Sequence, residues 1–135
     1  MAPSFVDTNI FLRHLTHDDP QQSPRSTAFF KAIEDGREQA WTTHLAIAEI
    51  VWVLGGSYRL SRADIRDILL PLISLPGLRI PGKGIFARIF ELFVNTKIDY
   101  IDCYHAALLE ARGETDLYSY DTDFDRVPSL RRQEP

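Results

Sequence analysis

The chain has 135 residues, of which 44% are hydrophobic and 25% are charged, and its formal net charge is −4. This length suits one domain that buries roughly two-thirds of the surface its unfolded chain exposes. The acidic balance argues against a general basic nucleic-acid binder, and the single cysteine, Cys103, excludes disulfides within the chain. No apolar run is long enough for a membrane span, and no leader precedes the first strand, so we expect one cytoplasmic domain over residues 1–135 without membrane partners.

The first half of the chain alternates between strand and helix patterns. A short apolar strand over residues 4–6 ends at Asp7, and a helix is expected over 8–17. Ser23 is expected to cap a second helix, with Pro24 at its first position and Gly36 at its end. A strand over 40–43 precedes a helix from His44 to the glycines at 55–56. Apolar positions surround nearly all of that helix, so it should be central.

The second half continues the alternation. Ser61 and Asp64 form the start of a helix that reaches about residue 75, and a strand is expected over 78–80. Helices are then expected over 83–93 and from a cap at Asp99 to residue 111. A fourth strand over 117–120 ends at Asp121, and a weak fifth lies near 129–132. Strands separated by helices predict an α/β fold, with a mostly parallel sheet covered on both faces in three layers.

Four acidic residues occupy notable places in this pattern. Asp7 and Asp121 directly follow apolar strands, and parallel neighbouring strands would bring both carboxylates to one sheet edge. Glu49 is the one charged residue on an otherwise apolar helix, where a carboxylate needs a cation or is costly to bury. Asp102 lies in the first turn of its helix, where the helix dipole tolerates an anion.

Converging carboxylates repel one another unless a cation neutralises them. Magnesium or manganese is the natural choice, because both ions prefer oxygen ligands and usually keep several waters. Such ions can activate water and stabilise charge on a phosphate, so the four acids predict one or two ions in a site for phosphodiester hydrolysis.

Four short motifs carry a family resemblance: Val6-Asp7-Thr8-Asn9, Ala48-Glu49-Ile50, Asp99-Tyr100-Ile101-Asp102 and Ser119-Tyr120-Asp121-Thr122-Asp123-Phe124. In this order and at these separations, the chain resembles PIN-domain ribonucleases, and more narrowly the VapC-like toxins of VapBC-type toxin–antitoxin pairs. The resemblance implies that Asp7, Glu49, Asp102 and Asp121 are catalytic metal ligands. It also implies a sheet in the order 3-2-1-4-5, a homodimer, RNA as substrate, 5′-phosphate and 3′-hydroxyl products, and inhibition by an antitoxin protein.

The other polar residues of these motifs have supporting or alternative roles by the same resemblance. They are Thr8, Asn9 and Ser119 as small polar neighbours of the ligands, and Asp99 and Asp123 as the nearest substitute acids. Candidates for contact with the substrate are Arg13, Arg59, Lys83 and His105, although solvated helix faces use the same residue types. Trp52 and Phe90 are interpreted as packing residues or as part of a dimer surface.

Structural alternatives exist for several of these acids. Asp7 can serve simply as a helix cap, and capping alone explains Asp99. Asp121 and Asp123 both lie in a turn that favours Asp, and Asp121 ranks first because it ends the strand. At the level of the whole protein, the alternatives are a catalytically weak RNA-binding or regulatory module that acts through an antitoxin complex, and a phosphate-accepting aspartate at Asp7.

Overall fold

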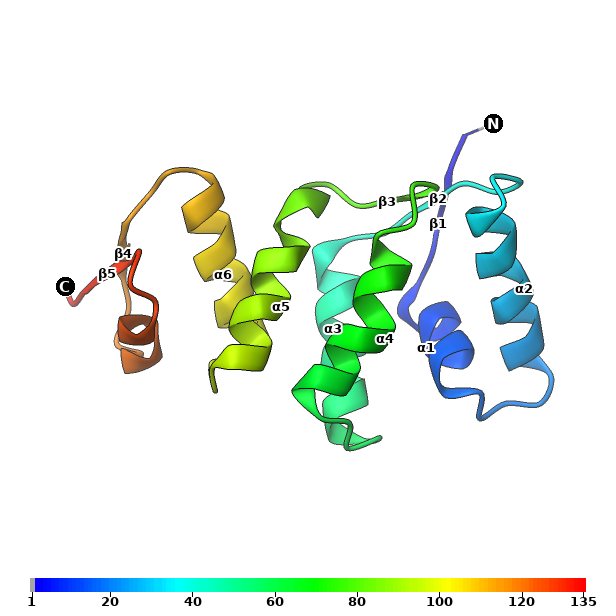
Figure 1. Cartoon of the computed structure of the whole chain (residues 1–135), viewed down its shortest axis with the longest axis horizontal. Coiled ribbons are helices and arrows are strands. Elements are labelled where there is room, and N and C mark those ends of the chain that lie inside the picture. Colours follow the sequence, from blue (N-terminus) through cyan, green and yellow to red (C-terminus); the bar gives the residue numbers. More distant parts are fainter. Residues whose placement is uncertain (1) are drawn as a thin grey trace. The chain divides into compact units, whose positions relative to one another are not determined.

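The structure, a computed structural model, describes residues 2–135. These residues form two compact units: an N-terminal unit up to Lys83 and a C-terminal unit from Gly84 (Figure 1). The expectation of one domain over residues 1–135 stays a prediction.

The N-terminal unit is built on three short parallel strands, β1 (Ser4–Phe5), β2 (Ala40–Trp41) and β3 (Leu78–Arg79), in the order β1-β2-β3. Four helices connect them: α1 (Thr8–Thr16), α2 (Gln22–Glu34), α3 (His44–Gly56) and α4 (Arg62–Ile73). The pairing continues beyond β2, because the Thr42 hydroxyl donates to the Val6 carbonyl oxygen at 2.9 Å. This bond fixes the end of β1 immediately before Asp7.

Helix starts follow the predicted capping chemistry at α4, where the Ser61 hydroxyl accepts a hydrogen bond from the Asp64 backbone N–H at 3.1 Å. Thr43 caps α3 in the same way and accepts from the Ala46 N–H at 3.2 Å. The predicted stop after α2 is also observed, because Gly36 has a φ of 79°, which favours glycine.

The predicted cap at Ser23 is wrong. Helix α2 already begins at Gln22, because the Asp19 carboxylate accepts hydrogen bonds from the Gln21 and Gln22 N–H groups at 2.9 and 2.8 Å. Ser23 lies in the first turn, where its hydroxyl accepts from the Asp19 N–H at 3.2 Å. The two side chains therefore exchange capping bonds, and the stronger cap comes from the acid upstream.

Helix α3 is central on one face only. Ile47, Ile50 and Leu54 are fully buried, whereas Leu45 and Trp52 are each 79% exposed. The expectation of a helix buried nearly all round is therefore wrong for the face that carries Leu45 and Trp52. Hydrophobicity alone could not distinguish packing positions from exposed apolar positions on this helix.

The 3-10 turn η1 (Lys83–Ile85) begins on the last residue of the N-terminal unit. The C-terminal unit then contains α5 (Phe86–Asn95), α6 (Tyr100–Ala111), β4 (Asp116–Tyr118), η2 (Thr122–Arg126) and β5 (Arg131–Gln133). The ring of Phe90 packs against those of Phe86, Phe93 and Tyr100, with centroids 5.7 to 6.4 Å apart. Phe90 is fully buried by this packing of α5 against α6. It is therefore a core residue and contributes nothing to an exposed surface.

Every strand pairing in the structure is parallel, and helices connect most successive strands, which confirms the predicted α/β class. The five strands form two sheets that keep the predicted neighbours 3-2-1 and 4-5. The remaining step of the predicted order, between strands 1 and 4, stays a prediction. No helix within residues 2–135 is both long enough and apolar enough to cross a membrane.

Candidate metal centre

The N-terminal unit positions Asp7 at the junction of β1 and α1. Val6 is buried, so Asp7 is the first residue to leave the sheet, and it has an extended backbone as the cap of α1. Its Oδ1 accepts a hydrogen bond from the Thr8 N–H at 2.8 Å. Asp7 therefore does cap a helix, but this bond uses only one carboxylate oxygen, and the side chain is exposed.

Glu49 projects from α3 toward the same corner. Its Oε2 accepts a hydrogen bond from the Thr8 hydroxyl at 3.3 Å, across 41 positions of sequence. Thr8 is 5% exposed, so it is a fixed, buried link between the two acids. Its backbone N–H contacts Asp7 and its hydroxyl contacts Glu49, which makes Thr8 the residue that holds this pair of carboxylates together.

The C-terminal unit brings Asp102 and Asp121 together. Asp102 is half-buried in the first turn of α6, and its carboxyl group lies close enough to Asp121 for the two to interact. Burial, followed by the negative charge of Asp121, raises the pKa of Asp102, while the nearby His105 opposes the shift. The two carboxyl groups therefore repel each other, and a bound cation would relieve this repulsion.

Asp121 is oriented by its neighbours in the turn. Its backbone N–H donates to the Ser119 hydroxyl at 2.9 Å, and its Oδ1 accepts from the Asp123 N–H at 2.9 Å. The carboxylate of Asp123 lies 4.0 Å from the Arg126 guanidinium, so it has a cation of its own. This difference favours Asp121 over Asp123 as the acid that pairs with Asp102.

Asp99 differs from its predicted structural role. It occupies the cap position of α6 with an extended backbone, but its side chain makes no capping hydrogen bond. Its charge instead adds to those that raise the pKa of Asp102. The interpretation of Asp99 as a simple helix cap is therefore wrong in its chemistry, because the carboxylate is left free of the helix N–H groups.

None of the four acids forms an ion pair with a Lys or Arg of residues 2–135, although acids elsewhere, such as Asp18, Asp35 and Glu110, do. Magnesium and manganese prefer carboxylate oxygens as ligands, and these carboxylates have no protein cation beside them. The Asp7–Glu49 pair and the Asp102–Asp121 pair therefore each fit half of a divalent-metal site. Within residues 2–135, no group of three or more His, Cys, Asp or Glu side chains is arranged to hold a metal. The grouping of all four acids stays a prediction.

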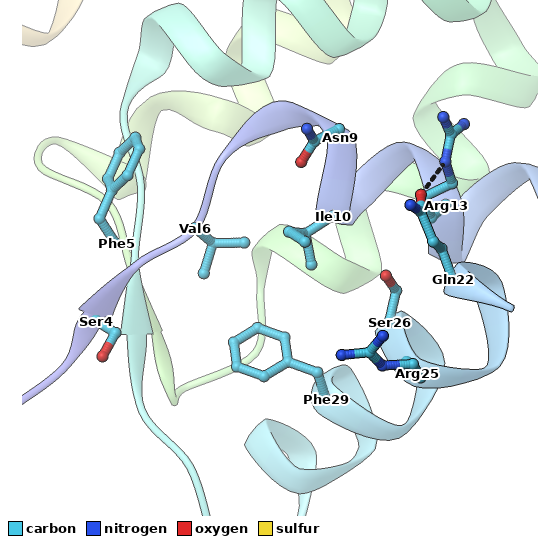
Figure 2. Close-up of a pocket in the computed structure, with 10 residues that line it drawn as sticks. All are labelled: Ser4, Phe5, Val6, Asn9, Ile10, Arg13, Gln22, Arg25, Ser26 and Phe29. Carbon is cyan, nitrogen blue, oxygen red and sulfur yellow. Dashed lines mark hydrogen bonds between the residues drawn. The ribbon is translucent and has the colours of Figure 1, made fainter.

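A cavity of about 540 Å³ lies beside β1, α1 and α2 in the N-terminal unit (Figure 2). Asn9 lines it two positions after Asp7, and Arg13 and Arg25 supply its only charges. Arg25 was missed by the sequence reasoning. It makes no hydrogen bond or ion pair with the described part of the chain, so its guanidinium is available. The remaining lining residues are Ser4, Phe5, Val6, Ile10, Gln22, Ser26 and Phe29.

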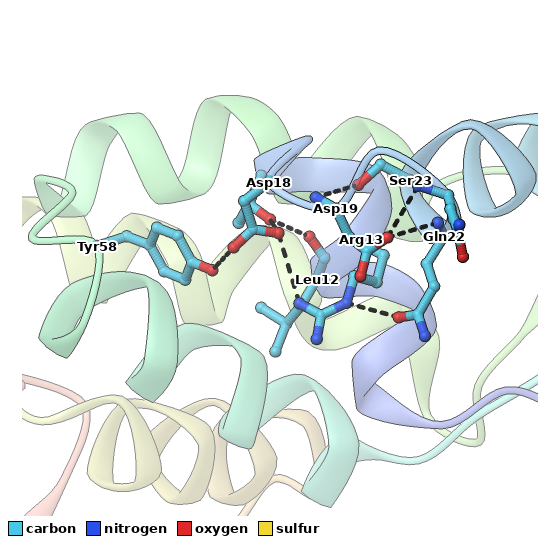
Figure 3. Close-up of polar contacts among 9 residues, drawn as sticks. Leu12, Arg13, Asp18, Asp19, Gln22, Ser23 and Tyr58 are labelled. Atoms are coloured by element: carbon cyan, nitrogen blue, oxygen red, sulfur yellow. Dashed lines mark hydrogen bonds and ion pairs between the residues drawn. The ribbon is translucent and has the colours of Figure 1, made fainter.

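Arg13 is held in place at the rim of this cavity. Its Nε donates to Gln22 Oε1 at 2.9 Å, and its Nη1 lies 3.4 Å from Asp18 Oδ1 (Figure 3). Asp18 also accepts hydrogen bonds from the Tyr58 and Thr16 hydroxyls. This network fixes the direction of the Arg13 guanidinium, and it leaves part of its donor set for a ligand.

The other predicted substrate contacts have different surroundings. The Lys83 ammonium donates to the carbonyl oxygens of Leu75 and Leu78, at 2.7 Å each, and burial lowers its pKa. Arg59 is exposed and has a φ of 55°, while His105 is exposed on α6 near Asp102. Lys83 is thus engaged by backbone, whereas His105 lies beside a candidate metal ligand.

The profile of the PIN domain family matches residues 4–130. This match covers nearly the whole chain and includes all four acids, so the protein belongs to the PIN domain family, whose members are typically metal-dependent nucleases. None of the curated proteins compared with the chain matches it.

Proposed function

We propose that this protein is a cytoplasmic, magnesium- or manganese-dependent endoribonuclease and the toxin of a VapBC-type toxin–antitoxin pair. The observation that carries the nuclease proposal is the set of two carboxylate pairs, Asp7 with Glu49 and Asp102 with Asp121, which lack protein cations in a member of the PIN family. The toxin role rests on the resemblance of the four motifs to VapC-like toxins.

In this proposal the four carboxylates together hold one or two ions. A bound magnesium or manganese ion would lower the pKa of the attacking water and stabilise the charge that develops on the phosphate. Thr8 positions Asp7 and Glu49 through its two hydrogen bonds, and the Ser119 hydroxyl positions Asp121 by accepting a hydrogen bond from the Asp121 backbone N–H. Asn9, Asp99 and Asp123 are supporting residues around these ligands.

The chain's own cations bind the substrate in the same proposal. Arg13 and Arg25 are the guanidinium groups of a cavity without carboxylates, which suits an anionic phosphate. His105 lies near Asp102 and would contact RNA close to the reacting phosphate. Arg59 and Lys83 are weaker candidates, because Lys83 already donates to two backbone carbonyls.

The direct test of the nuclease proposal uses the purified chain, freed from any antitoxin, with end-labelled RNA. We expect internal cleavage in magnesium or manganese, with 5′-phosphate and 3′-hydroxyl ends. RNA binding without cleavage under these conditions would favour the alternative, a regulatory module that acts through an antitoxin complex. Acid-labile phosphate on Asp7 would favour a phosphate-accepting aspartate.

Partner proteins are tested separately. The antitoxin is expected to be encoded next to this chain, and adding that purified protein should abolish cleavage at an equimolar ratio. Homodimerisation, which the family resemblance implies, is tested by light scattering at micromolar concentration. A monomer would contradict the dimer without affecting the nuclease proposal.

A further inference from the structure

Asp121 lies outside the strand ladder that would ordinarily fix the position of a site residue. Strand β4 ends at Tyr118, and Asp121 is an exposed residue at the start of η2. Phe124 is buried and anchors η2 to the core, but it lies three positions after Asp121. An exposed turn with few buried contacts is mobile unless hydrogen bonds restrict it. A carboxylate that stays beside Asp102 therefore needs a further constraint on this turn.

Arg132 supplies such a constraint from β5, the strand that pairs with β4 (Figure 1). Its Nη1 donates to the Ser119 carbonyl oxygen at 3.0 Å, two positions before Asp121. Its Nε and Nη2 donate to the two carboxylate oxygens of Asp125 at 3.0 and 3.3 Å, four positions after Asp121. One guanidinium therefore bonds to both flanks of the turn that carries Asp121.

Ser119 connects this guanidinium to Asp121. The Ser119 N–H donates to the Gln133 carbonyl oxygen at 3.0 Å, so both backbone groups of Ser119 are bonded to residues of β5. The Ser119 hydroxyl accepts a hydrogen bond from the Asp121 N–H at 2.9 Å. Two consecutive hydrogen-bonded contacts thus lead from Arg132 to the backbone of a candidate metal ligand.

The neighbouring residue Arg131 shows what a purely local ion pair on the same strand looks like. Its Nε and Nη2 donate to the Asp116 carboxylate at 2.9 and 3.1 Å, away from the turn, and its side chain is 73% exposed. The Arg132 side chain is only 14% exposed and also donates to Glu134 at 2.8 Å. A planar guanidinium held by three acceptors has little freedom, so it can fix the groups that it bonds.

The PIN domain match ends at residue 130, and Arg132 lies beyond it. We propose that Arg132 is a positioning residue for the metal centre, which holds the Asp121 turn in place by bonding to Ser119 and Asp125 at its two flanks. This inference rests on the proposed nuclease function. Arg132 acts through these two residues and not by contact with the ion or the RNA.

The test compares two charge-conserving variants of the full chain, Arg132→Lys and Arg131→Lys. Lysine keeps the positive charge, but its ammonium cannot reproduce the planar fork that reaches Ser119 and Asp125 together. Arg131→Lys is the matched control, because it removes the same kind of fork from the neighbouring residue without touching the turn. Binding of Mn²⁺ alone is measured from the electron paramagnetic resonance signal of the free ion, in the absence of RNA.

We expect Arg132→Lys to raise the Mn²⁺ dissociation constant roughly tenfold, the lower end of the range for residues that orient metal ligands. RNA cleavage by this variant should fall at low Mn²⁺ concentration and largely return at saturating Mn²⁺, because mass action refills the weakened site. Arg131→Lys should bind Mn²⁺ and cleave RNA like the parent. Melting curves without metal establish that each variant is folded at the assay temperature.

Asp125→Asn weakens the same contact from its other side, and Asp116→Asn is its control for the lost charge. Asp125→Asn should raise the Mn²⁺ dissociation constant more than Asp116→Asn does. It should add little to Arg132→Lys, because the two residues form one contact. If Arg132→Lys does not fold, this second pair of variants decides, and equal Mn²⁺ affinity of Asp125→Asn and Asp116→Asn would overturn the positioning role.

Two results with folded Arg132→Lys would also overturn it. One is parental Mn²⁺ affinity, and the other is an equal loss of affinity in Arg131→Lys, which would trace the effect to β5 in general. The failure of the proposed function looks different. A parent chain that neither binds Mn²⁺ nor cuts RNA would refute the nuclease and the positioning role with it, whereas a parent that does both beside an unaffected Arg132→Lys refutes the positioning role alone.

Discussion

Two substitutions at Thr8 should separate its role in the candidate site from its role in stability. Thr8 is 5% exposed, its N–H is bonded to Asp7, and its hydroxyl donates to Glu49. Thr8→Val removes the hydroxyl and keeps the shape of the side chain. Thr8→Ser keeps the hydroxyl and removes one buried methyl group. The backbone N–H, and therefore the bond to Asp7, is present in both variants.

The stability changes follow from these contacts. The bond to Glu49 is long, at 3.3 Å, and its acceptor is exposed to water, so its net contribution is at the low end of about 0.5–1.5 kcal/mol. Thr8→Val should therefore change the free energy of unfolding by less than about 1 kcal/mol. Thr8→Ser loses about 1 kcal/mol of methyl burial and should lower the melting temperature by roughly 3–5 °C.

Activity should change in the opposite order. Without the Thr8 hydroxyl, the Glu49 carboxylate loses its only hydrogen bond to the described chain. Residues that orient metal ligands typically contribute roughly 10- to 100-fold to activity or metal affinity. Thr8→Val should lose that much RNA cleavage, with partial recovery at higher magnesium concentration. Thr8→Ser should stay near the parent. Equal cleavage by Thr8→Val and the parent would refute the positioning role of Thr8.

Three further predictions concern metal, pH and the core. Cleavage should require magnesium or manganese, should stop in excess chelator, and should be poorly supported by calcium, whose longer bonds and looser coordination misalign water and phosphate; full activity in chelator would refute a metal mechanism. Burial, and then the charge of His17, lowers the pKa of His14, so the neutral form favours folding. The associated stability is present above the ordinary histidine pKa of about 6.5 and is lost as pH falls from there through the folded-state pKa. Melting curves of His14→Gln between pH 8 and 5 should therefore be flatter than the parent's, and unchanged pH dependence would contradict this. Tyr100→Phe should melt at the same or a higher temperature, because the buried Tyr100 hydroxyl lacks a partner within residues 2–135, and a clear loss of stability would reveal a bond to that hydroxyl.

Much of the fold follows from local patterns. The apolar runs and the caps at Ser61 and Gly36 predicted the class and most element boundaries, because these signals lie within a few residues of the structure they determine. The error at Ser23 has the same local origin. Ser23 and Asp19 both have capping chemistry, and the acid upstream competes successfully for the helix N–H groups.

The surface of α3 shows where local patterns stop being informative. The sequence allowed both Trp52 and Phe90 to be packing residues or part of a dimer surface, yet Trp52 is exposed, as is Leu45 on the same helix, while Phe90 is fully buried. Burial depends on which elements pack against a helix face, and a single sequence does not contain that information explicitly. The exposed apolar positions beside Glu49 were therefore visible only in the structure.

The candidate site was predictable in its residue types but not in its contacts. The position of Asp7 just after β1 was predicted, and Thr8 and Ser119 were recognised as small polar neighbours. The prediction that Asp121 directly follows a strand is wrong, because β4 ends at Tyr118 and Asp121 instead caps η2, where its side chain accepts from the Asp123 N–H. The bond from Thr8 to Glu49 joins residues 41 positions apart, and the interaction between Asp102 and Asp121 joins α6 to the start of η2. Such long-range contacts arise only from tertiary structure.

The central claim is that the four acids form a metal-dependent nuclease site. The most direct measurement compares RNA cleavage by the parent and by Asp7→Asn in magnesium, with melting temperatures recorded for both. Asparagine caps a helix about as well as aspartate, so the variant should fold and keep the bond to the Thr8 N–H. We predict cleavage by the parent and background cleavage by the variant. An Asp7→Asn protein that melts like the parent and cuts RNA at the parental rate would contradict the claim.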